Sequence, residues 1–181
     1  MAEGPTQIEK EYSLTSNEET DEVRLLALEI RPKKAGFAVF EGSTLLDWGV
    51  TRYGADTPAS RRIGSLLDRH RPDVVVTRWR PRLKHSRTGA SVVESIKRGA
   101  QRRSILVRIL DALQIRTFFK QRGCRSKHTT AVLLAEWFPE LAWRVPPKRK
   151  AWESEPHNAL LFDAVGTAVA ILTMESGREK V

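Results

Sequence analysis

The chain has 181 residues, 40% of them hydrophobic and 29% charged, with a formal net charge of +9 and an isoelectric point near 10.1. This length suits one globular domain with a substantial core. The single cysteine, Cys124, excludes an internal disulfide and a cysteine metal cluster. No apolar run approaches the roughly 20 residues that span a bilayer, and the acidic, polar first residues are unlike a signal peptide. We therefore expect a cytoplasmic protein that makes no membrane contact.

The positive charge favours nucleic acid as a partner. Residues 1–22 contain seven acidic residues and one lysine, so the rest of the chain is more basic than the total indicates. Such a field attracts polyanions, of which nucleic acid is the commonest; charge that serves solubility alone is the alternative. Residues 1–22 contain few large apolar residues and are predicted to be a disordered leader, and 176–181 a short tail.

Three apolar runs, 23–30, 35–41 and 44–52, follow the leader. A Pro-Lys break separates the first two, and a Gly-Ser turn separates the last two. Connections this short predict three neighbouring antiparallel strands. The first strand is apolar almost throughout and carries one carboxylate, Glu29, at its far end.

A helix and a fourth strand come next. In residues 57–70, Ile63, Leu66 and Leu67 have helical spacing, and Pro72 ends the helix. The β-branched run 73–77 is typical of a buried strand. Because a helix connects it to the third strand, it can run parallel to a neighbour.

The segment 78–103 contains nine Lys or Arg residues and one acid, Glu94. We interpret 78–89 as a loop and 90–113 as a helix, because its apolar residues mark one side. Residues 115–119 are predicted to form a fifth strand. Glu94 is expected to pair with Arg98, four residues on.

Two helices complete the chain. The helix at 127–137 is expected to turn Val132, Leu133 and Trp137 inward, and a proline-rich connection follows it. The last helix, 157–174, is apolar nearly all round and should be buried. The sequence thus predicts an α/β fold with a mixed five-stranded sheet, three strands antiparallel and two parallel, flanked by helices.

This order of elements resembles the ribonuclease H-like superfamily, and its RuvC-type Holliday junction resolvase branch in particular. The resemblance covers 23–175, which we treat as one domain. It rests on an ordered set of motifs: Leu28-Glu29-Ile30 followed by Gly36-Phe37-Ala38-Val39-Phe40, then Leu45-Leu46-Asp47-Trp48-Gly49, Arg71-Pro72-Asp73-Val74-Val75-Val76, and Phe162-Asp163-Ala164.

The resemblance implies cleavage of branched or structured DNA with Mg²⁺ or Mn²⁺, in a homodimer. It places Glu29 and Asp163 at two of the family's acidic positions, as catalytic residues and metal ligands. The chain departs from the pattern elsewhere. Arg78 lies near the position, at the end of the fourth strand, where the family has an acid. Leu160 lies where the family often has a second acid, one helical turn before Asp163.

Other side chains could complete or replace such a site. Glu155, just before the last helix, and His157, at its start, are candidate catalytic residues, His157 as a proton shuttle or ligand; a solvent-exposed position at the helix start is the alternative for His157. Glu29 could instead pair with Arg31 or Arg78. Asp163, inside an apolar helix, needs a backbone or arginine partner if it binds no metal.

The basic segment is the candidate nucleic-acid surface, since lysine and arginine contacts to phosphate give affinity without reading sequence. Trp79 could stack on a base or pack beneath the loop, whereas Trp137, Trp143 and Trp152 are expected in the core or in a lid. The candidate contacts are Arg78, Arg80, Arg82, Lys84, Arg87, Lys97, Arg98, Arg102 and Arg103.

Two functions remain open from the sequence. One is a metal-dependent endonuclease acting on branched DNA. The other is a catalytically inactive relative that binds nucleic acid or a protein partner through its basic face. Arg78 favours the second, because a guanidinium at that position repels divalent cations.

Overall fold

A five-stranded mixed sheet forms the middle layer of the protein. The computed structural model describes residues 22–79, 87–148, 152 and 156–176, and for residues 79 and 87–89 the backbone alone. The strand order is β3-β2-β1-β4-β5. The first three strands pair antiparallel, whereas β4 lies parallel to β1 and β5 parallel to β4, which confirms the predicted sheet. The strands are β1 (Arg24–Arg31), β2 (Lys34–Glu41), β3 (Thr44–Arg52), β4 (Val74–Trp79) and β5 (Leu106–Asp111).

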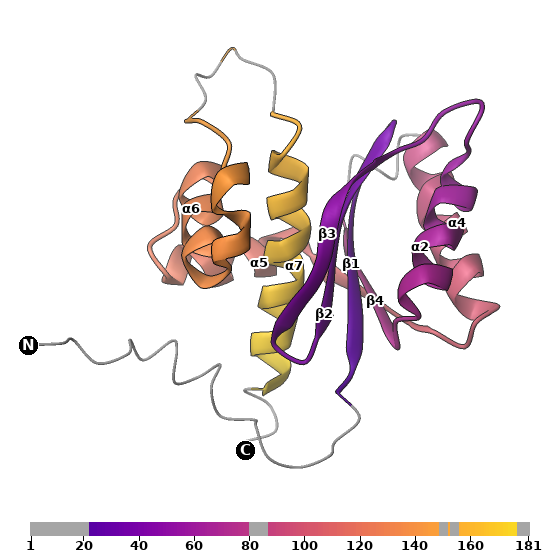
Figure 1. Cartoon of the computed structure of the whole chain (residues 1–181), viewed down its shortest axis with the longest axis horizontal. Coiled ribbons are helices and arrows are strands. Elements are labelled where there is room, and N and C mark those ends of the chain that lie inside the picture. Colours follow the sequence, from indigo (N-terminus) through magenta and orange to yellow (C-terminus); the bar gives the residue numbers. More distant parts are fainter. Residues whose placement is uncertain (1–21, 80–86, 149–151, 153–155, 177–181) are drawn as a thin grey trace, which may run out of the picture.

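Helices cover both faces of the sheet (Figure 1). On one face lie α2 (Ala59–His70) and α4 (Arg87–Gln101); on the other lie α5 (Ala112–Gln121), α6 (Lys127–Trp137), the 3₁₀ helix η1 (Pro139–Arg144) and α7 (Ala159–Ser176). Alternate side chains of β1 divide between the two layers, as the period of a strand requires. Leu26, Leu28 and Ile30 pack toward α2 and α4, while Leu25 and Ala27 pack toward α7.

The segment after α4 differs from the sequence prediction. The expected helix 90–113 ends at Gln101, and the expected strand 115–119 is helical, within α5. The chain leaves α4 through a turn in which Ser104 has φ 55°, a left-handed conformation that a helix cannot continue through. Asp111 then starts α5, because its carboxylate accepts a hydrogen bond from Leu113 N and Gln114 completes a capping box.

The helix α6 has the bounds that the sequence predicts. Ser126 caps it and forms a capping box with Thr129. Its buried side chains are Ala131 and Leu134, whereas Val132 is 37% exposed, so the expected inward position of Val132 is wrong. Leu133 and Trp137 are half-buried and pack against the main core, as expected. The helix contacts α7 and η1.

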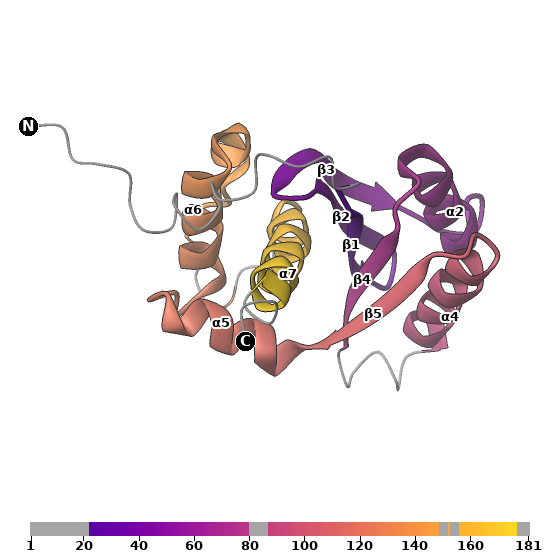
Figure 2. The ribbon, with the colours of Figure 1, turned by 90° about the horizontal axis from the view of Figure 1, so that it is seen from below.

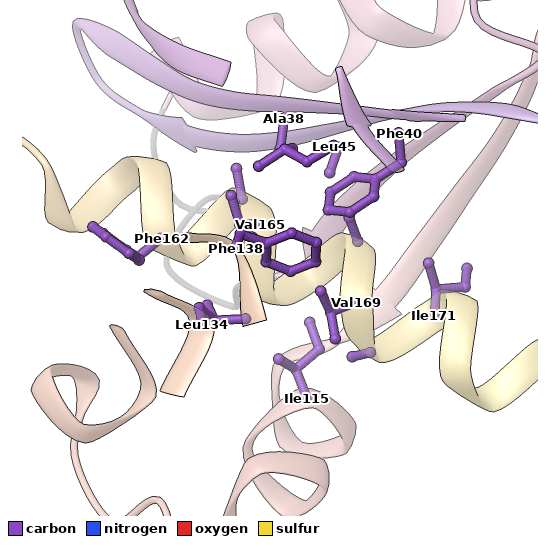
Figure 3. Packing of buried hydrophobic residues seen from close by; sticks show 14 of the residues in the cluster. Ala38, Phe40, Leu45, Ile115, Leu134, Phe138, Phe162, Val165, Val169 and Ile171 are labelled. Carbon is purple, nitrogen blue, oxygen red and sulfur yellow. The ribbon is translucent and has the colours of Figure 1, made fainter. Parts of the chain in front are cut away.

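The last helix, α7, lies at the centre of the second layer. Figure 2 shows it between the strands and α6. Figure 3 shows Phe162, Val165 and Val169 of α7 packed among Leu134, Phe138 and residues of the sheet. It is the one helix of the described residues that is long and apolar enough to cross a membrane, but 67% of that stretch is buried inside the protein. Its apolar character is accounted for by this packing.

Candidate functional site

The register of the central strands places Glu29 beside Arg78. Strands β1 and β4 run parallel with Leu28 opposite Thr77, so the next residue of each strand lies at the same level. Both side chains point to the α7 face of the sheet, because side chains two apart on a strand share a face. Glu29 lies two residues after Ala27, and Arg78 two residues after Val76, and both of these pack in the core on the α7 side. An acid and a cation therefore meet at the carboxyl edge of the sheet, where ligands commonly bind in α/β folds.

A glycine brings α7 close to this pair. Gly36 lies opposite Glu29 in the β1–β2 ladder. A Cβ atom at Gly36 would lie 2.1 Å from the backbone oxygen of Leu160, so only glycine permits this approach of the α7 backbone. Asp163 follows Leu160 by three residues, which is almost one helical turn. The contact at Gly36 thus sets the distance at which Asp163 reaches the strand ends.

Three cations and two carboxylates form one ion-pair cluster, consisting of Glu29, Arg31, Arg78, Lys127 and Asp163. Arg31 Nη1 lies 2.5 Å from Glu29 Oε1, and its Nη2 lies 3.2 Å from Asp163 Oδ2. Arg78 Nε donates to Glu29 Oε2 at 2.9 Å. Arg78 Nη2 is 3.4 Å from Asp163 Oδ2, at ion-pair distance without hydrogen-bond alignment. Lys127 Nζ donates to Asp163 Oδ2 at 2.8 Å.

The ion-pair cluster is largely shielded from water. Glu29 is 1% exposed, and the side chains of Asp163 and Arg78 are 10% and 11% exposed. Burial raises the pKa of Asp163, but the charges of Arg78, Lys127 and Arg31 outweigh it and hold that pKa below its usual value. Burial lowers the pKa of Arg78, and the charges of Glu29 and Asp163 more than offset this. Both Arg78 and Asp163 are therefore ionised at neutral pH.

Tyr53, which the sequence reasoning did not single out, holds the turn beside Arg31. Its hydroxyl donates to the backbone oxygen of Arg31, and the oxygen of Lys34 lies 3.1 Å away. Burial raises the pKa of Tyr53 to about 12. The buried hydroxyl fixes the backbone from which the Arg31 side chain reaches both carboxylates. Its position after a strand end carried no sequence signal for this role.

The arrangement does not fit a divalent cation. The two carboxylates that could bind Mg²⁺ or Mn²⁺ both contact guanidinium or ammonium groups, and the ion-pair cluster keeps one net positive charge. Among the described residues, no group of three His, Cys, Asp or Glu side chains is placed to hold an ion. Arg78 Nη2 lies 2.9 Å from Glu29 Oε2, against the oxygen that an ion would need.

The other two candidate catalytic residues do not complete such a site in the described part of the chain. Glu155 lies outside the described residues. His157 is exposed. Burial, together with the charges of Lys34, Arg52 and Arg144, lowers its pKa. Surroundings this positive suit an anion better than a metal ion.

Several cations lie near the start of α7. Lys34 and Arg52 face each other in the β2–β3 ladder, at the edge that carries Arg31. A cavity of about 300 Å³ opens between α5, α6 and α7, with Arg78, Asp163, Phe119 and Phe162 in its wall. We name the surrounding positive groups the basic rim: Lys34, Arg52, Arg116, Arg125, Lys127 and Arg144.

Of the predicted nucleic-acid residues that the structure describes, Arg78 belongs to the ion-pair cluster, whereas Lys97, Arg98, Arg102 and Arg103 lie on or just after α4. Arg80, Arg82 and Lys84 lie outside the described residues, as does the side chain of Arg87. Lys97 and Arg98 are exposed on α4, where Arg98 lies 3.8 Å from Glu94, confirming that pair. Arg102 and Arg103 follow the end of α4, at the opposite edge of the sheet from Arg78.

The helix direction explains this separation. Strands β4 and β5 are parallel, so α4 returns between them and ends at the edge where both strands begin. There Arg103 pairs with Asp68 at the end of α2. The basic rim, by contrast, comes from residues scattered along the sequence, with no charge run to mark them.

The tryptophans also differ from expectation. Trp143 is 71% exposed and Trp152 is 80% exposed, so a core position for either is wrong. Trp137 is half-buried and packs against the main core. The side chain of Trp79 lies outside the described residues.

Comparison with solved structures agrees with the fold described above. The structure of Thermus thermophilus RuvC in complex with a Holliday junction substrate is similar, with a TM-score of 0.59 at 15% identity, over 86% of this chain and 96% of that one. The chain has the RuvC-type ribonuclease H-like fold. The yeast mitochondrial Holliday junction resolvase Ydc2 is also similar, with a TM-score of 0.58 at 11% identity, over 92% of this chain and 86% of that one. No protein-family model matches this sequence, and no curated protein matches it.

Glu29 and Asp163 both contact Arg31 and Arg78, so the two carboxylates lie near each other. The structure also shows which cations pair with these two carboxylates. Arg31 and Arg78 were predicted as alternative partners of Glu29, and both contact it. Lys127 was not foreseen, because it belongs to a helix 36 residues before Asp163 and has no pattern that points to it.

Proposed function

We propose that this protein binds branched or otherwise structured DNA through the carboxyl edge of its sheet, and that it does so without a metal ion. The observation that carries the proposal is the ion-pair cluster. Arg31, Arg78 and Lys127 occupy the positions around Glu29 and Asp163 that a divalent ion would need.

The electrostatics of the cluster argue against hydrolysis. Two-metal cleavage of a phosphodiester needs several carboxylates that converge on ions about 4 Å apart. Here two carboxylates face three cations, and Glu29 is buried against two guanidiniums. Releasing Glu29 for a metal would leave Arg78 buried without its main partner, which is costly. The cluster therefore stabilises the meeting of β1, β4, α6 and α7.

The same edge is suited to a polyanion. The basic rim presents cations from β2, β3, α5, α6 and η1 around the start of α7. Contacts of this kind bind phosphate groups in any sequence. The similar structures include RuvC bound to a Holliday junction, which supports DNA as the partner and a branched form as the first one to test.

A metal-dependent endonuclease is the second candidate. It is favoured by one observation, namely that Arg78 Nη2 lies 2.9 Å from Glu29 Oε2 and 3.4 Å from Asp163 Oδ2, so a single nitrogen atom bridges the two carboxylates. This candidate requires Arg31 and Arg78 to swing away when DNA and an ion arrive. A homodimer, implied by the resemblance, stays a prediction.

Binding and cleavage of a four-way DNA junction distinguish the two candidates. We expect the junction to bind in EDTA, with no divalent ion required, and to stay intact in Mg²⁺ or Mn²⁺. Cleavage that requires the metal and disappears in both Glu29→Gln and Asp163→Asn would overturn the metal-free proposal. Cleavage that persists in both variants would point to a contaminant. Absence of binding at low salt would remove the DNA proposal itself.

A further inference from the structure

An exposed tryptophan stands at the end of η1, next to the basic rim. Trp143 is 71% exposed, whereas tryptophan usually buries most of its large ring. The guanidinium carbon of Arg144 lies 3.9 Å from the centre of its ring. A cation at this distance is held by the ring's negative face and limits the directions the ring can take.

This pair is fixed to the edge of the sheet that carries the ion-pair cluster. Asn158 Nδ2, just before α7, donates to the backbone oxygen of Arg144 at 3.4 Å. The charges of Lys34, Arg52 and Arg144 all contribute to lowering the pKa of the neighbouring His157. Lys34 and Arg52 face each other across β2 and β3. An open aromatic surface thus adjoins cations of the rim.

We propose that Trp143 and Arg144 form a stacking site for one unpaired nucleobase, with neighbouring phosphates held by the basic rim. Every base has a π face, so an aromatic ring beside a positive groove binds unpaired bases with little sequence preference. Bases inside a duplex are covered by their neighbours and cannot reach the ring. The inference rests on the proposed DNA binding, and it names the preferred form: nucleic acid with unpaired bases.

The test compares single-stranded and duplex DNA. Fluorescence anisotropy is measured with an oligothymidine of about 20 nucleotides and with a fully paired duplex of the same length. Trp143→Leu removes the ring. Trp143→Phe keeps a smaller one. Leu106→Ala is the matched control, because Leu106 is an exposed apolar residue, 50% accessible, at the start of β5 on the opposite edge of the sheet.

We expect Trp143→Leu to weaken oligothymidine binding by about 5- to 150-fold, the range for loss of one stacked base. Duplex binding should change by less than about twofold, and Leu106→Ala should change neither. Trp143→Phe should bind oligothymidine within about threefold of the wild type. It should also lose part of the tryptophan fluorescence quenching that binding produces, since the fluorescent indole under the base has been replaced by a phenyl ring.

Each other outcome overturns the stacking site. Equal weakening on single strands and duplex would mean that Trp143 makes a general contact. Unchanged affinity in Trp143→Leu, or unchanged quenching in Trp143→Phe, would remove the stacking site while leaving DNA binding in place. If the wild type binds neither DNA at low salt, the proposed function and the stacking site are both wrong.

Discussion

Arg78 decides how the site behaves, more than either carboxylate does. It lies where the RuvC-type resemblance leads one to expect an acid, at the end of β4, and its guanidinium contacts both Glu29 and Asp163. Arginine offers several donors in a rigid plane, so one side chain can bridge two carboxylates. Arg78 thereby cross-links the ends of β1 and β4 to α7.

Removing the guanidinium should destabilise the fold. Arg78→Met keeps an unbranched side chain but leaves Glu29, 1% exposed, with less compensation. Loss of one partner from a buried ion pair typically costs 3–5 kcal/mol. Because Arg31 still contacts Glu29, we expect a loss near the lower end, about 3 kcal/mol. Urea denaturation of the variant and the wild type measures it.

The matched control is Arg98→Met on the surface of α4. The Arg98 side chain is 61% exposed, and its Nε lies 3.8 Å from Oε1 of Glu94, which is also exposed and lies one helical turn earlier. Such pairs contribute at most a few tenths of a kcal/mol, so this variant should unfold like the wild type, within about 0.5 kcal/mol. Equal, small effects for the two variants would show that the ion-pair cluster does not hold the fold together.

At the scale of elements, the strands were predictable where turn chemistry and period agreed. The three antiparallel strands follow from short connections between apolar runs, and α6 follows from its apolar residues and the proline-rich connection after it. Between 90 and 121 the apolar residues satisfy both the helical and the strand period, so period alone could not place β5. The missed signals were local: the turn ending at Ser104 and the cap formed by Asp111 with Gln114.

The contact between α7 and β2 is the most sensitive element-level feature. Gly36→Ala places a methyl group 2.1 Å from the Leu160 oxygen, which belongs to the backbone and cannot rotate away. The helix must shift, and overpacking of this kind typically costs 1–3 kcal/mol. We expect about 3 kcal/mol from urea unfolding, because Asp163 is displaced from its partners as well.

Gly54→Ala provides the comparison, because nothing lies within 4 Å of the added methyl group. It should leave stability within about 0.5 kcal/mol of the wild type. A Gly36→Ala protein that is as stable as Gly54→Ala would contradict the close approach of α7 to β2.

At the scale of the whole molecule, the sequence indicated that the protein is basic but not where the charge gathers. The segment 78–103 is rich in cations in the sequence, with nine Lys or Arg among its residues. The fold sends Arg102 and Arg103 to the far edge. It gathers Lys34, Arg52 and other scattered cations around α7 instead. Strand register and helix direction produce this surface, and neither can be read from charge spacing.

The salt dependence of DNA affinity distinguishes the basic rim from the cations at the end of α4 as the DNA-binding surface. Each phosphate contact adds about 0.9 to the slope of log affinity against log salt on duplex DNA. A double variant, Arg52→Ala with Arg125→Ala, removes two exposed cations of the basic rim, so we expect the slope to fall by up to about 2. Arg102→Ala, an exposed cation at the opposite edge, should leave the slope unchanged. Anisotropy titrations of a four-way junction over a series of salt concentrations measure these slopes. The reverse result, a flatter slope for Arg102→Ala and none for the double variant, would place the DNA on the surface that the sequence first indicated.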